Sequence, residues 1–262
     1  LQHEDGHSHI IAGTIPNCVS YDPTFAYEVV TIIREGMRRM YEEQEDVYYY
    51  VTLMNENYPH PGLAEAGAGA EQGILKGLYK LTDGGKTAAS GKGKGLRVQL
   101  MGSGTILREV MAGAELLKND FGVTADLWSA TSYNELRRDG MATERWNLLH
   151  PTEPRRKSWV ESVLEGHEGP VIASTDYMRN YADQVREYVQ AAGRRYVVLG
   201  TDGFGRSDYR SKLREFFEVD RFYVVVAALK ALADDGRIKA SVVADAITKY
   251  KLDTERAAPW TV

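Results

Sequence analysis

The feature of this sequence that most restricts its fold is an alternation of short apolar segments with longer amphipathic ones. The short segments are rich in aliphatic, β-branched and aromatic residues, which is typical of strands buried in a parallel sheet. The longer segments repeat an apolar residue every three or four positions, which indicates a helix with one buried face. The predicted strands are 96–101, 123–128, 171–173 and 196–199, and the predicted helices are 106–119, 177–190 and 209–217.

Strands that alternate with helices pair in parallel through right-handed crossovers, so that helices cover both faces of the sheet. The sequence therefore predicts an α/β protein, a three-layer sandwich with a mostly parallel sheet. In the first predicted helix, Ile106, Val110, Ala114 and Leu117 mark the inward stripe. Residues 221–250 predict two further helices that are split at Gly236.

A strand, helix, strand unit precedes this region. Residues 14–20 predict a strand, and Asp22 followed by Pro23 predicts a helix start, because a capping side chain precedes a proline in the first turn. Residues 47–54 predict the second strand, and residues 55–69, with two prolines and three glycines, break the regular structure. The predicted buried face of the helix consists of Phe25, Val29, Ile32, Ile33, Gly36 and Met40.

Two segments between these regions are less regular. Residues 70–81 predict a short amphipathic helix or a strand. Residues 82–95 are rich in glycine and lysine with almost no apolar residue, which predicts a surface loop or a disordered excursion.

Charge and cysteine content restrict the partners. The net charge of −5 argues against binding to nucleic acid or to anionic lipid, both of which need a basic face, so we expect small molecules or proteins as partners. The single cysteine, Cys18, excludes internal disulfides and a cysteine metal cage, which suits a reducing compartment. No apolar stretch reaches the roughly 18 residues of a membrane span. We therefore expect a cytoplasmic location.

The first nine residues concentrate the proton-transfer chemistry. They hold three of the six histidines, His3, His7 and His9, beside Glu4 and Asp5. This cluster permits three interpretations: a zinc site with three histidines and one carboxylate, a solvated polar loop, or an active-site loop without metal. Gly6 disfavours the zinc site, because it interrupts both the helical and the extended spacing. Since such a cluster begins the chain without an initiator Met, we expect the chain to be part of a longer protein.

Two glycine-rich turns are further candidates for ligand binding. Residues 102–105 lie between a strand and a helix, and could present backbone N–H groups to a phosphate or could simply form a tight turn. Residues 200–208 follow a strand, and could bind a ligand at the carboxyl end of the sheet. Alternatively, Asp202 caps amides there and Phe204 packs into a neighbouring subunit. The charge runs 144–147 and 154–157 predict a solvated face.

Several blocks of this sequence resemble one enzyme family in collinear order. Together, LQHEDGHSHI, TIPNCVSYDPTFAYEVV, VYYYVTLMNENY, DGMATERWNLLHP, ASTDYM and VLGTDGFGRSD resemble the C-terminal part of the homodimeric pyruvate dehydrogenases. These are the thiamine-diphosphate-dependent decarboxylating components of pyruvate dehydrogenase complexes. More distantly, EDGHSH is similar to a transketolase motif in which an acidic-glycine turn leads to an active-site histidine, here His9.

The resemblance implies a domain division and an activity. It implies that residues 1–65 end a pyrimidine-binding middle domain and that residues 66–262 form a transketolase-like C-terminal domain. It also implies a homodimer that decarboxylates pyruvate and acetylates the lipoyl group of dihydrolipoamide acetyltransferase. The family's Gly-Asp-Gly…Asn diphosphate motif is absent from this sequence, as is its pyrimidine-binding glutamate. We therefore expect the main ligands of thiamine diphosphate and Mg²⁺ to lie outside this chain.

The same resemblance assigns roles within the histidine cluster. His3 is the candidate for contacting the substrate-derived part of the intermediate, and Asp5 and His9 are candidates for substrate orientation or support of the loop. It gives His7 no role. Two rival interpretations are a non-catalytic dimerisation or docking domain of a transketolase-like enzyme, and a dinucleotide-binding domain that uses residues 102–105.

Overall fold

The structure is a computed structural model, and it describes residues 5–88 and 93–262. Its main sheet has the strand order β3-β5-β4-β6-β7. The four predicted strands are present as β4 (Arg97–Gly102), β5 (Thr124–Ser129), β6 (Val171–Ser174) and β7 (Tyr196–Leu199), and neighbours among them pair in parallel. A strand that the sequence left ambiguous, β3 (Tyr79–Thr82), adds an antiparallel edge beside β5. The prediction of a mostly parallel sheet is confirmed.

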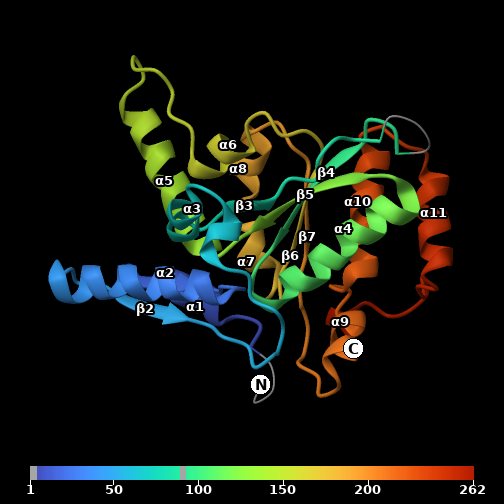
Figure 1. Cartoon of the computed structure of the whole chain (residues 1–262), viewed down its shortest axis with the longest axis horizontal. Helices are drawn as coiled ribbons and strands as arrows, with labels where there is room; N and C mark the ends of the chain where they lie inside the picture. Colours follow the sequence, from blue (N-terminus) through green and yellow to red (C-terminus); the bar gives the residue numbers. More distant parts are fainter. Residues whose placement is uncertain (1–4, 89–92) are drawn as a thin grey trace.

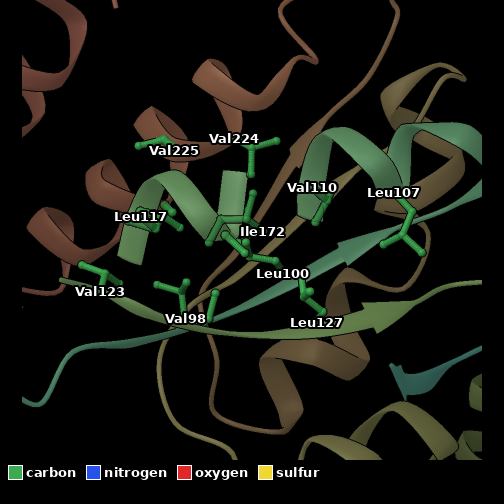
Figure 2. Close-up of a cluster of buried hydrophobic side chains, with 14 of the residues drawn as sticks. Val98, Leu100, Leu107, Val110, Leu117, Val123, Leu127, Ile172, Val224 and Val225 are labelled. Atoms are coloured by element: carbon green, nitrogen blue, oxygen red, sulfur yellow. The ribbon is translucent and has the colours of Figure 1, made fainter. Parts of the chain in front are cut away.

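Helices cover one face of this sheet through an apolar core (Figure 1). This layer contains α4 (Leu107–Phe121) and α10 (Arg221–Asp234), and α11 (Ala240–Lys249) packs against α10. Figure 2 shows Leu100 and Ile172 of the sheet pointing toward Val110 of α4 and Val224 of α10. The predicted inward stripe of the first helix is buried throughout, and the break at Gly236 separates α10 from α11, so both predictions are confirmed.

The opposite face is covered by α5 (Tyr133–Leu149), α6 (Trp159–Leu164), α7 (Arg179–Asp183) and α8 (Arg186–Ala191). Alternate residues of the strands point to this side, because successive side chains in a strand face opposite ways. Those residues include Met101, Trp128, Ala173 and Val198. The three-layer sandwich is therefore confirmed.

Several helix predictions need correction. The sequence predicted one helix over residues 177–190, but the chain folds as α7 and α8 with Gln184 and Val185 between them. The sequence also missed α5, whose second half carries the charge run 144–147 on an exposed surface. Residues 209–217 form a helix as predicted, α9 (Arg210–Phe216). Residues 70–81 form α3 (Ala70–Lys76) followed by β3, and the described residues between 82 and 95 form loops and turns after β3 ends.

The N-terminal unit contains α1 (Ser8–Gly13), β1 (Cys18–Tyr21), α2 (Ala26–Met37) and β2 (Tyr48–Val51), with a π-helical turn at Arg38–Glu42. The two strands pair in parallel and are shorter than predicted. The predicted face of α2 is wrong at Ile33, which is 45% exposed, whereas Glu28 and Thr31 are buried. The spacing of apolar residues did not predict the buried face of α2 correctly, because that face includes polar side chains.

Buried Glu28 explains how α2 is attached to the main sheet. Its carboxylate accepts hydrogen bonds from the hydroxyls of Tyr79 on β3 and Ser129 on β5, both at 2.6 Å. It also accepts one from the amide of Phe25 at 2.9 Å. Burial raises the pKa of Glu28 above its ordinary value. The two units of the chain therefore share a buried polar contact as well as a continuous apolar core.

No helix among the described residues is long and apolar enough to cross a membrane.

Candidate active site

A cavity of about 460 Å³ lies where the N-terminal unit meets the carboxyl ends of β6 and β7. Open α/β sheets bind ligands outside these ends, where neighbouring strands connect in opposite directions. Here β4 connects to β5 on one side, and its other neighbour β6 connects to β7. The cavity is lined by Asp5, Thr52, Leu53, Met54, Asn55, Asp176, Tyr177, Thr201, Arg210, Leu213, Arg214, Phe217 and Val219.

The walls of the cavity are partly apolar and partly charged. Leu53 and Met54 on one side, with Leu213 and Phe217 on the other, give an apolar surface. The polar groups come from separate segments of the chain, as expected where several loops converge on a ligand. This combination suits a small molecule with an apolar body and a polar end.

Ion pairs fix the loop after β2 to α4 and α9. Glu56 accepts a hydrogen bond from Arg214 on α9 at 2.7 Å and pairs with Arg108 on α4. Arg214 also lies 3.4 Å from Glu109, which in turn accepts from Arg221 at 2.8 Å. Because Arg214 is only 9% exposed and has carboxylates on two sides, it neutralises charge behind the cavity wall.

Asp176 follows β6, is half-buried and lines the cavity. Burial raises the pKa of Asp176, and the positive charge of Arg214 and a hydrogen bond from Thr105 oppose that rise. The Thr105 hydroxyl donates to Asp176 at 3.2 Å. Asp176 is therefore a half-buried carboxyl group with a raised pKa at the cavity, and such groups are often found among the acids and bases of active sites.

Asp5, predicted as a site residue, lines the cavity. One of its carboxylate oxygens accepts from the amides of His7 at 3.3 Å and Ser8 at 2.9 Å, and the other accepts from the Ser8 hydroxyl. These bonds satisfy donors at the start of α1. Asp5 thus holds the first turn of α1 against the cavity.

His9, also predicted as a site residue, is fully buried beneath the cavity and does not line it. Its Nε2 lies 2.8 Å from the hydroxyl of Thr52, which does line the cavity. The ring centroids of Tyr177 and Tyr181 each lie 4.7 Å from the centroid of the imidazole ring. This burial lowers the pKa of His9 to about 4, while the negative charge of Asp5 opposes the shift. His9 is therefore a neutral imidazole near pH 7.

The other two histidines of the cluster differ from His9 and from each other. His3, the leading sequence candidate, lies outside the described residues. His7 is exposed on the surface. Within residues 5–88 and 93–262, no group of three or more His, Cys, Asp or Glu side chains could hold a metal ion.

The turn at residues 102–105 is not an open phosphate site. Its residues are buried, and the Gly104 amide donates to the carbonyl of Asp22 at 3.0 Å. The backbone of Gly104 packs so closely that an added Cβ would lie 2.7 Å from the Asp22 carboxylate oxygens. The phosphate interpretation is wrong, because the segment after β1 fills this position. The dinucleotide interpretation, which depended on the same turn, falls with it.

The loop at residues 200–208 contributes one residue to the cavity, Thr201. Asp202 accepts a hydrogen bond from the amide of Arg179 at 3.1 Å, which confirms the capping interpretation. Phe204 is 78% exposed, and its packing into a neighbouring subunit stays a prediction.

Sequence reasoning missed Thr52, Asp176 and Arg214. A usable signal existed for Asp176, because it follows the predicted strand 171–173 and so lies at the same edge of the sheet as residues 200–208. No local pattern marked Arg214, since its partners lie far away in the sequence.

Comparisons with known proteins agree with this arrangement. The family model for the pyruvate dehydrogenase E1 component middle domain matches residues 1–61, and the model for the transketolase-like TK C-terminal domain matches residues 77–220. The pyruvate dehydrogenase E1 components of Pseudomonas aeruginosa, Cupriavidus necator and Escherichia coli are 60%, 58% and 55% identical to this chain. These matches cover 99–100% of the chain, and the chain spans 28% of the length of each relative.

Solved structures show the same fold. A transketolase from Leishmania mexicana has a TM-score of 0.54 at 14% identity, over 89% of this chain and 29% of that chain. The inactive β4 tetramer of a split-gene transketolase has a TM-score of 0.50 at 14% identity, over 85% of this chain and 60% of that chain. The chain therefore belongs to the transketolase-like family, and over almost its whole length it is similar to the C-terminal part of the pyruvate dehydrogenase E1 components.

Proposed function

We propose that this chain contributes part of the active site of an enzyme that decarboxylates pyruvate and transfers the acetyl group to the lipoyl arm of dihydrolipoamide acetyltransferase. The high identity to pyruvate dehydrogenase E1 components supports this activity. The observation that carries it here is the position of Asp5. This residue of the histidine cluster lines a cavity at the carboxyl ends of β6 and β7.

The activity needs thiamine diphosphate, which supplies the carbanion chemistry when bound. Because the Gly-Asp-Gly…Asn motif of the family is absent from this sequence, we place the main ligands of the cofactor and of Mg²⁺ on the rest of the enzyme. The residues of this chain bind and orient the substrate. In this proposal His3 contacts the substrate-derived group, Asp5 orients it from the cavity wall, and the apolar residues of that wall exclude water.

The division of the chain is part of the same proposal. Residues 1–65 are the end of the pyrimidine-binding middle domain, and residues 66–262 are the C-terminal domain. The whole enzyme is a cytoplasmic homodimer. The contact between the two domains then forms the cavity, which explains why its polar groups come from both.

The test uses the intact enzyme with matched histidine variants. Replacing His3 with Ala should lower the rates of pyruvate decarboxylation and of acetyl transfer at least tenfold, because a group that touches the reacting atoms is lost. Replacing exposed His7 with Ala should leave both rates unchanged. Equal rates in the His3 variant and the unaltered enzyme would exclude the role of His3. An unaltered enzyme without pyruvate decarboxylation would exclude the proposed function itself.

A second candidate function is assembly, in which the C-terminal domain builds the dimer and offers a docking face to the acetyltransferase. It is favoured by Met141, Leu148 and Leu149 on α5, which are 48%, 77% and 54% exposed. The end of α5 projects from the body of the molecule (Figure 1). Removing residues 66–262 from the intact protein should then abolish dimer formation and complex assembly. An unchanged dimer that still binds the acetyltransferase would exclude this role.

A further inference from the structure

Three polar side chains from three separate segments form a hydrogen-bonded chain beneath the cavity. The hydroxyl of Thr52, after β2, donates to Oδ1 of Asp22, after β1, at 2.8 Å. The same hydroxyl lies 2.8 Å from Nε2 of His9 on α1. Asp22 and His9 are buried, whereas Thr52 is half-buried and lines the cavity. Thr52 is therefore the member of this chain that a ligand in the cavity can reach.

Two buried atoms of this chain of bonds have no partner. They are Nδ1 of His9 and Oδ2 of Asp22, and neither has a hydrogen bond within the described residues. An unpaired buried polar atom costs roughly 1–3 kcal/mol, so a fold keeps one only where other contacts hold it in place. Here the tyrosine rings around His9 and the backbone of Gly104 against Asp22 hold both groups.

This hydrogen-bonded chain has two protonation states, which differ at Asp22. When Asp22 is ionised, Thr52 donates to it and accepts from Nε2–H of His9. When Asp22 is protonated, it donates to Thr52, Thr52 still accepts from Nε2–H of His9, and the proton of the Thr52 hydroxyl points to the cavity. The states differ by one proton on Asp22, and His9 stays neutral in both. In the ionised state Thr52 keeps one lone pair free, which can accept a proton from a ligand.

We propose that Asp22 is a buried base which removes a proton from the ligand in the cavity through the hydroxyl of Thr52, with His9 as a positioning residue. In this step the ligand's O–H bond breaks and its proton binds Oγ of Thr52. The Thr52 hydroxyl proton moves to Oδ1 of Asp22, and the electron pair stays on the ligand oxygen. No oxidant or further reactant takes part. The inference rests on the proposed function, because it assigns the base to a hydroxyl-bearing species of that reaction.

The electrostatics of Asp22 suit such a role. Burial raises the pKa of Asp22 to about 7, and the hydrogen bond from Thr52 partly opposes that rise. A base is most effective when its pKa lies near the working pH. The titratable groups that face Asp22 or its two partners are Asp5, His9, Glu28, Tyr50, Tyr58, Tyr133, Asp176, Tyr177 and Tyr181.

The sign of the pH dependence follows from the need for an ionised base. The rate of acetyl transfer should rise as pH increases through about 7 and then level off. Asp22→Asn should lower kcat at least tenfold and remove this rise, while the KM for pyruvate changes less than threefold. Thr52→Val should give the same loss, and Thr52→Ser, which keeps the hydroxyl, should restore the rate to within threefold. The double variant should be no slower than either single variant, because the two residues act as one unit.

The experiment measures these kinetics in the intact enzyme, with Thr248→Val and Asp245→Asn on exposed positions of α11 as controls. Both controls should match the unaltered enzyme. The carbonyl band of protonated Asp22 in the infrared spectrum gives a readout without turnover. It should titrate near pH 7, be absent in Asp22→Asn, and shift to a higher midpoint in Thr52→Val, which loses a donor to the carboxylate.

Two outcomes separate this inference from the proposed function. An enzyme that decarboxylates pyruvate but keeps its kcat and pH profile in both the Asp22→Asn and the Thr52→Val variant overturns the relay alone. An enzyme without that activity overturns the proposed function. In that case the infrared titration decides whether Thr52 is coupled to Asp22. An Asp22 band whose midpoint is the same in Thr52→Val overturns the relay.

Discussion

Glu56 allows a direct test of how the cavity wall is held. Its carboxylate pairs with Arg214 at 2.7 Å, and the two side chains are 16% and 9% exposed. We expect Glu56→Gln to destabilise the protein, because the guanidinium of Arg214 loses a charged partner in a site with little water. Glu56 also pairs with Arg108, so the loop after β2 loses its attachment to both α9 and α4.

The magnitude follows from burial. Removing one partner of a buried ion pair costs roughly 3–5 kcal/mol. Glu109 remains 3.4 Å from Arg214, and glutamine still accepts a hydrogen bond, so we expect about 2–3 kcal/mol. The matched control is Glu71→Gln, which removes a pair with Arg34 at 2.9 Å whose side chains are 46% and 73% exposed. An exposed pair contributes about 0–1 kcal/mol.

Denaturant unfolding of the intact protein measures both variants, and the free energy of unfolding is compared at equal slopes. Glu56→Gln should also raise the KM for pyruvate, because Leu53 and Met54 of the same loop line the cavity. A destabilisation by Glu56→Gln no greater than that by Glu71→Gln would show that the buried network does not hold the loop.

Two further predictions concern the segment after β1 and the histidine beneath the cavity. Gly104→Ala should destabilise the protein by at least 1 kcal/mol more than Gly193→Ala in thermal unfolding, since both glycines have positive φ but only Gly104 faces the Asp22 carboxylate. Equal losses would contradict the close packing. For His9, the folded-state pKa of about 4 lies below the ordinary 6.5, so its contribution is fully present above pH 6.5 and is lost as pH falls through 4. The free energy of unfolding that is lost is about 3 kcal/mol. His9→Gln should therefore reduce the fall in melting temperature between pH 7.5 and 4.5. An identical fall in the variant and the unaltered protein would contradict a buried neutral imidazole.

The parts of the fold that the sequence predicted are those governed by repeating local patterns. Strands β4 and β6 are buried on both faces, so most of their residues are apolar and stand out from the loops around them. Helix α4 has one apolar stripe against the sheet, and its period is visible over the whole helix. In these elements the burial that stabilises the structure also determines the residue types.

The elements that the sequence did not predict depend on contacts distant in the chain. Helix α5 buries only its first half, so its apolar period ends before the helix does. The buried side of α2 contains Glu28, which is satisfied by Tyr79 and Ser129 and cannot be recognised as buried from its neighbours in sequence. Local hydropathy carries no information about such partners.

The histidine cluster shows the same distinction within the site. Proximity in sequence suggested that Asp5 and His9 act together on one ligand, but the first turn of α1 directs them to different places. Asp5 stays at the cavity wall, whereas His9 enters the interior and reaches the cavity only through Thr52. Asp22 accepts a hydrogen bond from the same Thr52 hydroxyl, although the sequence predicted only a helix start at Asp22. The chemistry of the cluster thus depends on residues outside it, because a buried imidazole can act on a ligand only through the group that separates it from the cavity.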